Sequence, residues 1–415
     1  MPSFLPFFDK ASHQVEKLRS AFPSHPRLAA LRLAAWALGR AVSGHVIGEV
    51  TLIPPSRRKG DSRLAFLLRG GIGDIIINLS WLDALTALPG SGRAVDIYTN
   101  TPKDVMRALC RNMPCVAEIR SLKEHVPFER YDAVFDVMQN PQLKAVCWER
   151  LEKMSSALYD YAQRLLRFQA AHASFYLDEN QAMGIHYADV MGGGRRRQPD
   201  FDGSLHLKDS DFTLTCVDIP KVREKFGLAR PFVTLQREAG SCADSLKLWS
   251  AEKYRELLHA METRFPAYDL VLIGSDGSVD LAGDACVKDL RGKTSFEELM
   301  VMVKKASLHI GGEGLIPHLR HFLRAGSSVV LFGPSCARML GYPENIALSG
   351  TECPNGCEGI MQTWQQTCLK GHAYCRSLEQ IQVEDVLRAC GKVLVHEDAM
   401  ASRMVEQKCG AFEEA

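Results

Sequence analysis

Short apolar runs alternate with longer segments of helical spacing along most of this chain. In the helical segments, apolar residues recur three and four positions apart, which is the spacing of an amphipathic helix. In the first half of the chain, strands are predicted at residues 64–68, 94–98, 116–119 and 133–137, and helices at residues 75–88 and 143–169. Strands that alternate with helices of this length are typical of parallel βαβ units.

A second alternation begins near Pro231. Here strands are predicted at residues 232–235, 270–274, 308–311 and 328–332, and helices at residues 251–264, 296–305 and 318–323. The pattern therefore predicts an α/β protein with two doubly wound, Rossmann-like lobes that face each other across a cleft. Ligands of such sheets bind at the carboxyl ends of the strands.

Stretches rich in proline and glycine set the expected domain boundaries. Residues 1–60 are predicted to be a helical extension, which ends in a breaker-rich stretch. The first lobe is expected over residues 61–215, with the best linker candidate at 192–201, and the second lobe over residues 216–395. The remaining residues, 396–415, are expected to be a tail.

The charge balance excludes one class of function. Lys and Arg number 50 against 49 Asp and Glu, which gives a formal net charge of +1. A dedicated nucleic-acid binder normally shows a basic excess, so no nucleic-acid partner is expected.

The most apolar run near the N-terminus, residues 28–42, does not qualify as a membrane span. Arg32 and Arg40 interrupt it, and it is shorter than the roughly 20 residues that a span needs. It is predicted to be a helix that packs on the first lobe or on a partner subunit, or one that attaches peripherally to the inner face of the cell membrane. Residues 1–10 lack the pattern of a secretory signal, so a cytoplasmic location is expected.

The first candidate site follows the first predicted strand and opens a helix. It contains Gly71, Gly73 and Asp74. Glycines allow unusual backbone angles and close approach of a ligand, and the amides at a helix N-terminus attract anions. Asp74 has two interpretations that the local sequence leaves open, a helix cap and a catalytic base.

Two further candidate sites lie in the second half. Gln236 follows a predicted strand, and Lys247 stands just before a helix, where it is either a solvated surface residue or a partner for a phosphate. Residues 310–318 place glycines between a strand and a helix, around Glu313, whose carboxylate can accept both hydroxyls of a ribose. His318 ends this loop, and alone it is typical of a core histidine.

These pieces, in this order, resemble glycosyltransferase family 9, the family of the lipopolysaccharide heptosyltransferases. The resemblance covers about residues 64–394. Its motifs are Gly71-Ile72-Gly73-Asp74, residues 247–254 (KLWSAEKY), residues 289–299 (DLRGKTSFEEL), the loop from Glu313 to His318, and Phe332-Gly333-Pro334. The chain departs from the family at Glu313, where Asp followed by Ser or Thr and then Gly is usual, and near Ser80-Trp81, where Pro is usual.

The resemblance implies an inverting transferase of the GT-B type that needs no catalytic metal and uses ADP-heptose. Asp74 would be the base that deprotonates the acceptor hydroxyl. Lys247 and the amides of residues 312–315 would stabilise the diphosphate leaving group, and Glu313 would hold the nucleoside. The donor-binding residues implied are Gly71, Gly73, Gln236, Lys247, Gly312, Glu313, Gly314, Leu315 and His318.

Four of the 13 cysteines are clustered near the C-terminus, namely Cys353, Cys357, Cys368 and Cys375. Four thiolates brought together by short loops suit a structural zinc or iron ion, and a finger over residues 353–375 is predicted on the second lobe. Buried thiols without a metal and a redox role are the alternatives. The scattered cysteines are expected to be reduced and to pack as small apolar residues.

The function expected from these observations is transfer of a heptose from ADP-heptose to a saccharide acceptor such as the lipopolysaccharide core. The same-class alternative is a transferase for protein, O-antigen or capsule that uses another nucleotide sugar. The alternative from a different class is a non-catalytic relative that binds nucleotides. The partners implied are a nucleotide sugar and a saccharide, glycolipid or protein acceptor.

Overall fold

The computed structural model describes residues 50–54, 62–90, 94–172, 200–205, 207, 214, 217–237, 245–275, 279–281, 285–358 and 364–394. The chain divides into two compact units, Met1–Phe212 with Cys357–Ala373 and Thr213–Gly356 with Tyr374–Ala415. The predicted tail and the predicted N-terminal extension up to residue 49, including the apolar run 28–42, lie outside the described residues, as does most of the linker candidate 192–201.

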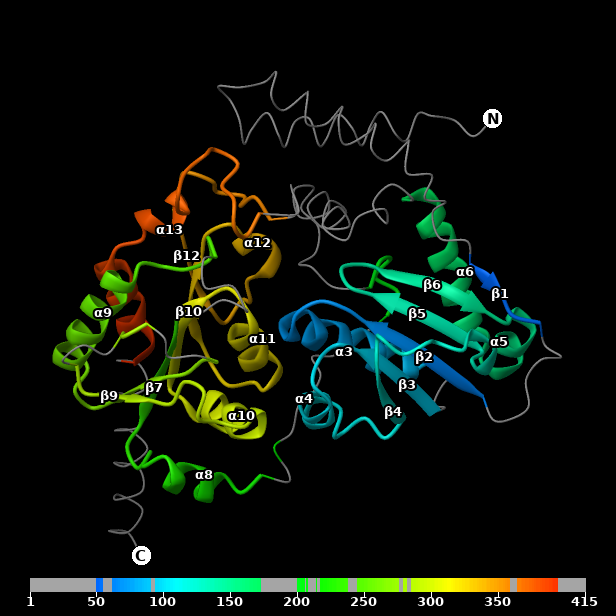
Figure 1. The fold of residues 1–415 in the computed structure, drawn as a ribbon, viewed down its shortest axis with the longest axis horizontal. Helices are drawn as coiled ribbons and strands as arrows, with labels where there is room; N and C mark the ends of the chain where they lie inside the picture. The colour runs from blue at the N-terminus through cyan, green and yellow to red at the C-terminus, as the bar shows by residue number, and fades with distance from the viewer. Residues whose placement is uncertain are drawn as a thin grey trace, which may run out of the picture. The chain divides into compact units, whose positions relative to one another are not determined.

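The first unit is built on a six-stranded sheet of order β1-β6-β5-β2-β3-β4 (Figure 1). Its strands are β1 (Thr51–Leu52), β2 (Arg63–Leu68), β3 (Ala94–Thr99), β4 (Val116–Ser121), β5 (Ala133–Val137) and β6 (Pro141–Val146). Its helical segments are α3 (Ile72–Thr86), α4 (Lys103–Leu109), η2 (Phe128–Arg130), α5 (Trp148–Met154) and α6 (Ser156–Ala171). Every neighbouring pair of strands is parallel except β5 and β6.

An aromatic cluster fixes α3 on this sheet. Trp81 of α3 packs edge-on against Phe66 of β2 and Phe135 of β5, with ring centroids 5.5 and 5.8 Å away. The Trp81 Nε1–H donates to the Tyr161 hydroxyl of α6 at 2.6 Å, so the buried indole nitrogen has a partner. These contacts hold the start of α3, and therefore Asp74, at the carboxyl end of β2.

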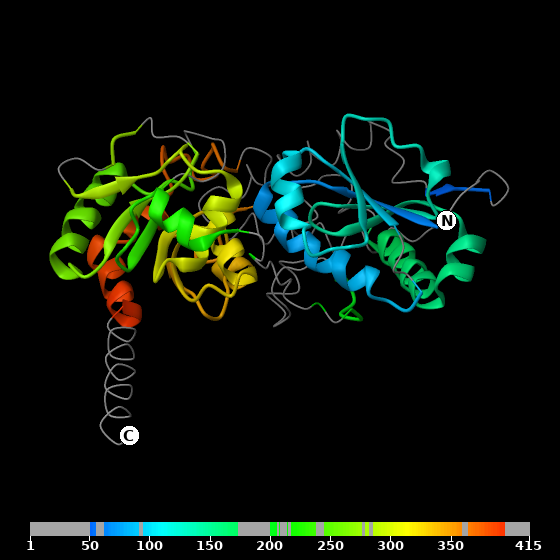
Figure 2. The same ribbon diagram turned by 90° about the horizontal axis from the view of Figure 1, so that it is seen from below.

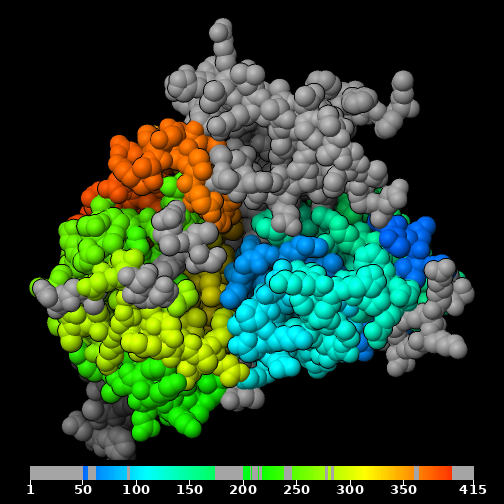
Figure 3. Space-filling view, viewed as in Figure 1, coloured from blue at the N-terminus to red at the C-terminus, as the bar shows by residue number. Residues whose placement is uncertain are grey.

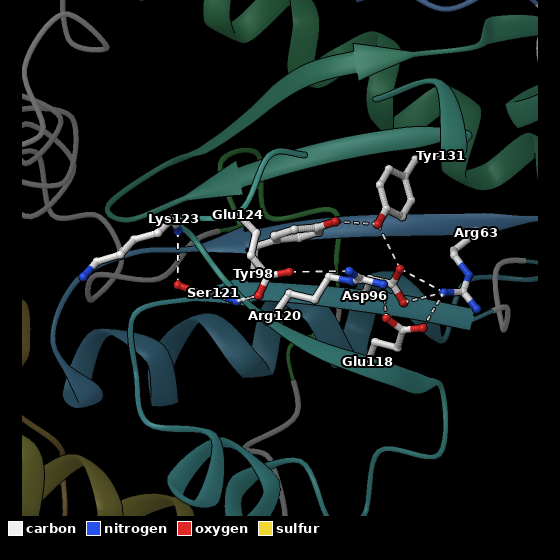
Figure 4. A network of polar contacts seen from close by, with 9 residues as sticks. All are labelled: Arg63, Asp96, Tyr98, Glu118, Arg120, Ser121, Lys123, Glu124 and Tyr131. Atoms are coloured by element: carbon white, nitrogen blue, oxygen red, sulfur yellow. Dashed lines mark hydrogen bonds and ion pairs between the residues drawn. The ribbon is translucent and has the colours of Figure 1, made fainter. Parts of the chain in front are cut away.

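A polar network ties the strands together on the other side of the unit (Figure 4). The fully buried Asp96 carboxylate accepts two hydrogen bonds from Arg63, at 2.8 and 2.9 Å, and one from the Tyr131 hydroxyl at 2.9 Å. Burial is the largest reason why the pKa of Tyr131 is raised, and its bonds to Tyr98 and Asp96 add to it. A buried charge that is paired and hydrogen-bonded in this way is a structural feature of the lobe.

The predicted helix over residues 143–169 is wrong at its start, because residues 141–146 form the strand β6. Only residues 138–140 connect β5 to β6, and so short a connection forces an antiparallel hairpin. The burial of β6 alternates from Pro141 to Ala145, which is the period of a strand with one buried face. Helix follows only from Trp148.

The second unit contains a fully parallel six-stranded sheet of order β12-β11-β10-β7-β8-β9. Its strands are β7 (Phe232–Gln236), β8 (Asp269–Leu272), β9 (Val287–Asp289), β10 (Leu308–Gly312), β11 (Ser328–Phe332) and β12 (Ile346–Ser349). Its helices are α8 (Ile219–Lys225), α9 (Ala251–Arg264), α10 (Phe296–Lys305), α11 (Leu315–Phe322), α12 (Ala337–Leu340), α13 (Arg376–Gln380) and a last helix over residues 383–394.

The core of this unit lies between the sheet and two helices. Apolar residues of α9 and of the helix 383–394 pack against one face of β7, β8, β10 and β11. The helices α10 and α11 pack on each other, and α11 also contacts β10 and β11. Figure 2 shows the helices of each unit beside their own sheet, and in the space-filling view the atoms within each unit are closely packed (Figure 3).

The predicted α/β class with two Rossmann-like lobes is confirmed by these two sheets. Helices α9 and α10 and strands β5 and β11 have the predicted bounds. The sequence analysis missed the edge strands β9 and β12 and the helices α4, α8, α12, α13 and 383–394. It also placed residues 51–52 in the helical extension, whereas they form the edge strand β1 of the first sheet. In the part of the chain that the structure describes, no helix combines the length and the apolar character needed to cross a membrane.

Candidate functional site

The strand order of the second sheet locates a candidate site. The chain leaves β7 toward β8 on one side and, later, β10 toward β11 on the other, although β7 and β10 are neighbours. In doubly wound sheets, ligands bind at the carboxyl ends of the two strands where the order reverses. The segments that leave these two strand ends carry Gln236 and Lys247, and Gly312, Glu313 and Gly314.

A buried polar cluster lies at this point. Glu313, only 7% exposed, directs Oε2 to the Lys247 ammonium and accepts a hydrogen bond from the Ser335 hydroxyl at 2.8 Å. Its other oxygen, Oε1, lies 3.4 Å from Nε2 of His318. The structure therefore brings together Lys247, Glu313 and His318, which the sequence placed in two separate motifs.

The cluster holds Glu313 in its charged form. Burial by itself raises the pKa of a carboxyl group, but the charge of Lys247 and the contact with His318 outweigh it and hold the pKa of Glu313 well below the usual 4.5. The result is a buried ion pair between Lys247 and Glu313. An ammonium held in this way beside a helix N-terminus can bind a second anion, provided that the ligand offers the carboxylate new hydrogen-bond donors in return.

The glycine loop leaves room beside this pair. A Cβ on Gly314, the residue before α11, would meet no atom within 4 Å, so a ligand can approach the backbone there. Leu315 is the first residue of α11, whose amino end favours a negatively charged ligand. One predicted donor is already used, because the Glu313 amide donates to the Leu331 carbonyl at 3.2 Å.

The other residues of the motif 247–254 position Lys247. Trp249 is buried and donates its Nε1–H to the Ile381 carbonyl at 3.2 Å, and the Tyr254 hydroxyl donates to the Gln236 carbonyl at 2.6 Å. Ser250 caps α9 by accepting from the Lys253 amide at 3.3 Å. The Tyr254 bond ties α9 to the end of β7, and the Trp249 bond ties the loop before α9 to Ile381. Both bonds fix the backbone next to Lys247.

Asp74 belongs to the first unit, on the first turn of α3. Its Oδ2 accepts from the Gly71 amide at 2.9 Å, so the carboxylate caps the helix. Gly70 has φ of +99°, and a Cβ there would come within 2.7 Å of Asp74 Oδ2. The turn through Gly70, Gly71 and Gly73 thus fixes the carboxylate at the carboxyl end of β2. The capping interpretation is visible in these contacts, and the role as a base stays a prediction.

The predicted metal site is not confirmed. Within the described residues, which include all four clustered cysteines, no three His, Cys, Asp or Glu side chains gather closely enough to hold an ion. Cys353 and Cys375 belong to the second unit, whereas Cys357 and Cys368 lie in the segment that groups with the first.

Two residues of the cluster were missed by the sequence analysis, Ser335 and Tyr342. The Tyr342 hydroxyl lies 2.7 Å from His318 Nδ1. Ser335 directly follows the motif Phe332-Gly333-Pro334, which was a usable signal. Tyr342 had none, because its partner lies 24 residues away on a different element.

Comparison with known proteins finds similarity at the level of structure only. No protein-family model matches the chain, and no curated protein matches it significantly in sequence. The structure of E. coli ADP-heptose lipopolysaccharide heptosyltransferase II superposes with a TM-score of 0.50 and 16% sequence identity, over 81% of this chain and 99% of that one. The chain has the heptosyltransferase fold.

Other solved structures superpose less well. The iron-containing dodecameric glycosyltransferase TibC of enterotoxigenic E. coli has a TM-score of 0.49 and 15% identity, over 82% of this chain and 78% of that one. A family 9 glycosyltransferase of Veillonella parvula has a TM-score of 0.48 and 13% identity, over 82% of this chain and 99% of that one. The superposition on heptosyltransferase II confirms the predicted fold of the chain.

Proposed function

We propose that the protein is an inverting glycosyltransferase that moves a sugar from a nucleoside diphosphate sugar, most specifically ADP-heptose, to a hydroxyl group of a saccharide acceptor. The observation that carries the proposal is the cluster of Lys247, Glu313, Ser335 and His318 at the point where the strand order of the second sheet reverses. This cluster combines a cation for the diphosphate with a charged acceptor for sugar hydroxyls. The fold supports the same function by its likeness to a heptosyltransferase.

Each group of the cluster has a role in this proposal. The diphosphate of the donor binds beside the Lys247 ammonium and the amino end of α11, where its growing negative charge is stabilised as the sugar leaves. Glu313 accepts hydrogen bonds from hydroxyl groups of the nucleotide sugar. These bonds replace its contact with Lys247, which turns to the diphosphate. Because the side chains of the cluster are already positioned and largely buried, little reorganisation is needed during the reaction.

Asp74 serves as the general base in the first unit. It takes the proton of the acceptor hydroxyl, whose oxygen then attacks the anomeric carbon of the donor. The bond from that carbon to the diphosphate oxygen breaks, the electron pair leaves with the nucleoside diphosphate, and the configuration at the carbon is inverted. The turn through Gly70 and Gly71 that positions the carboxylate supports this role.

Calorimetry with ADP and adenosine tests the donor site through the variant Lys247→Ala. Loss of the ammonium should weaken ADP binding by about 10-fold or more, the range of a charged hydrogen bond, and should leave adenosine binding nearly unchanged. The matched control is Lys305→Ala, which removes an exposed lysine from the same unit, near the amino end of β10. Equal losses for ADP and adenosine would contradict the assignment of Lys247 to the diphosphate.

A panel of nucleotide sugars identifies the donor, with binding and release of nucleoside diphosphate as the readouts. Transfer from ADP-heptose to a core saccharide supports the leading proposal, and transfer from another nucleotide sugar supports a role in protein, O-antigen or capsule modification. Binding without release in the presence of any acceptor supports the non-catalytic alternative.

We also propose that Cys353, Cys357, Cys368 and Cys375 bind a structural zinc or iron ion. Cys353 and Cys368 each begin a tight turn that closes three residues later on a glycine in the left-handed region, Gly356 and Gly371, through bonds of 2.9 and 3.0 Å. Elemental analysis of untagged protein should find about one equivalent of metal. Metal far below one equivalent would leave only a packing role for these thiols.

A further inference from the structure

Behind the cluster at Glu313 lies a second polar contact that the proposed function does not use. The Tyr342 hydroxyl is 2.7 Å from Nδ1 of His318, and Nε2 of the same ring faces Glu313 at 3.4 Å. Tyr342 and His318 are 5% and 4% exposed. The three residues come from three places in the second unit, namely the end of β10, α11 and the segment after α12.

The chemistry of the groups restricts where the protons lie. An ionised carboxylate only accepts hydrogen bonds, so the ring nitrogen that faces Glu313 must carry its hydrogen. In a neutral imidazole the other nitrogen, Nδ1, is then bare and can only accept. The Tyr342 hydroxyl is the donor that matches it.

The ring of Tyr342 is itself held in place. His321 stacks on it with ring centroids 3.8 Å apart and planes inclined by 20°, and His321 Nδ1 is 2.7 Å from Glu344. The backbone N–H of Asn345 donates to the Tyr342 carbonyl at 3.1 Å, which closes a turn that begins at the tyrosine. Both the ring and the backbone therefore fix the direction of the hydroxyl.

We propose that Tyr342 is a positioning residue of the donor site: by donating its hydroxyl hydrogen to His318 Nδ1, it keeps the imidazole in the tautomer whose Nε2–H faces Glu313. The carboxylate is then held by His318 on one oxygen and by Ser335 on the other. Lys247 becomes the one partner of Glu313 that a diphosphate can take over, since the carboxylate stays anchored when the lysine turns to the ligand. The effect of Tyr342 on donor binding rests on the proposed function, whereas the tautomer of His318 does not.

Nuclear magnetic resonance of the protein labelled with ¹⁵N-histidine tests the structural part without any ligand. The signals of His318 are assigned by their loss in His318→Gln. At a pH above 8, where an ordinary histidine with pKa near 6.5 is neutral, the wild type should show a protonated Nε2 and a bare Nδ1. Tyr342→Phe keeps the stacked ring and removes only the donor, so the Nδ1 signal should shift and the Nδ1–H tautomer should gain population. An Nδ1–H tautomer or an imidazolium in the wild type, or an unchanged spectrum in the variant, would overturn the proposal.

Titration with ADP tests the consequence. Tyr342→Phe should raise the Kd of ADP about 5-fold, the effect of roughly one lost hydrogen bond, and should raise the KM of the donor more than it lowers kcat. The control is Tyr268→Phe, which removes a buried hydroxyl of the same unit that bonds to the Leu394 carbonyl at 3.4 Å. An unchanged Kd in Tyr342→Phe together with the expected spectrum would overturn the role in positioning. If the wild type binds no ADP at all, the proposed function fails, and the spectrum still decides the tautomer.

Discussion

Gly311 lies where a side chain does not fit. A Cβ at this position would come within 2.7 Å of His309 Nε2 and 2.9 Å of the Gln236 carbonyl oxygen. Both neighbours are constrained, because His309 is fully buried and Gln236 ends the adjacent strand. The glycine therefore lets β7 and β10 approach each other at the point where the candidate site begins.

Gly311→Ala should lower the free energy of unfolding by about 1–3 kcal/mol, the usual cost of overpacking. Chemical denaturation of the purified variant measures this directly. Gly314→Ala is the matched control, because a Cβ there meets nothing within 4 Å. Similar losses in the two variants would mean that the crowding around Gly311 is not the reason for its glycine.

Asp74→Asn should reduce turnover about 100-fold or more, because an amide cannot take the proton of the acceptor. The fold should survive, since the amide oxygen can still accept from the Gly71 amide, as the carboxylate does at 2.9 Å. Initial rates with saturating donor and acceptor measure the effect, and thermal unfolding checks the fold. Asp104→Asn, in the first turn of α4, controls for the loss of one acidic charge at a helix start of the same unit. Near-normal turnover would leave Asp74 with the role of a cap only.

At the scale of elements, the helices with clear start signals were predicted best. Ser250 and Ser295 are both N-caps, and the helices after them, α9 and α10, have the predicted bounds. The short edge strands β9 and β12 were missed because neither carries a buried apolar run. At residues 141–146 the period of two was hidden by residues that also suit a helix, and the decisive constraint was the three-residue connection to β5.

The sequence predicted some residues of the candidate site but not the contacts between them. Two motifs along the chain indicated Lys247 on the one hand and Glu313 with His318 on the other, because each motif follows a strand and stands near a helix start. Their contacts depend on the pairing of β7 with β10, which no local pattern shows. Ser335 directly follows the motif Phe332-Gly333-Pro334, whereas Tyr342 joins the cluster from a further segment without such a signal, so only the fold reveals the tyrosine.

Ser295→Ala should destabilise the protein by about 1 kcal/mol, because it removes the hydroxyl bond of the capping box of α10. In this box the Ser295 hydroxyl accepts from the Glu298 amide at 3.2 Å, and the Glu298 carboxylate accepts from the Ser295 amide at 2.9 Å. Ser295→Asn keeps a good cap and should cost much less. Denaturation midpoints of the two variants measure the difference, and equal midpoints would show that the cap contributes little.

At the scale of the whole molecule, two buried groups make stability depend on pH. Burial lowers the pKa of His309 well below its usual 6.5, and the charge of Arg320 adds to this effect. The pKa of Glu313 is likewise held below its usual 4.5. In both cases the unfolded chain binds a proton that the folded chain does not, so acid favours unfolding.

The free energy of unfolding should therefore decline as the pH falls below about 6.5, and decline further below about 4.5. Urea denaturation at a series of pH values from 8 down to about 3 follows the first step and the onset of the second. His309→Gln should flatten the first step and Glu313→Gln the second, whatever each variant does to stability at pH 8. A first step that is equally steep in His309→Gln would assign it to other groups.

The order of the segments that form the two units has a consequence for folding during translation. The second unit is interrupted by Cys357–Ala373 and resumes at Tyr374. Its core includes Val386, Leu387, Cys390 and Leu394 from the helix 383–394. During translation the sheet from β7 to β12 must therefore wait, with one apolar face incomplete, until the residues up to Leu394 have left the ribosome. The first unit can close its core earlier, so nascent chains halted before residue 383 should expose apolar surface to chaperones mainly from the second unit.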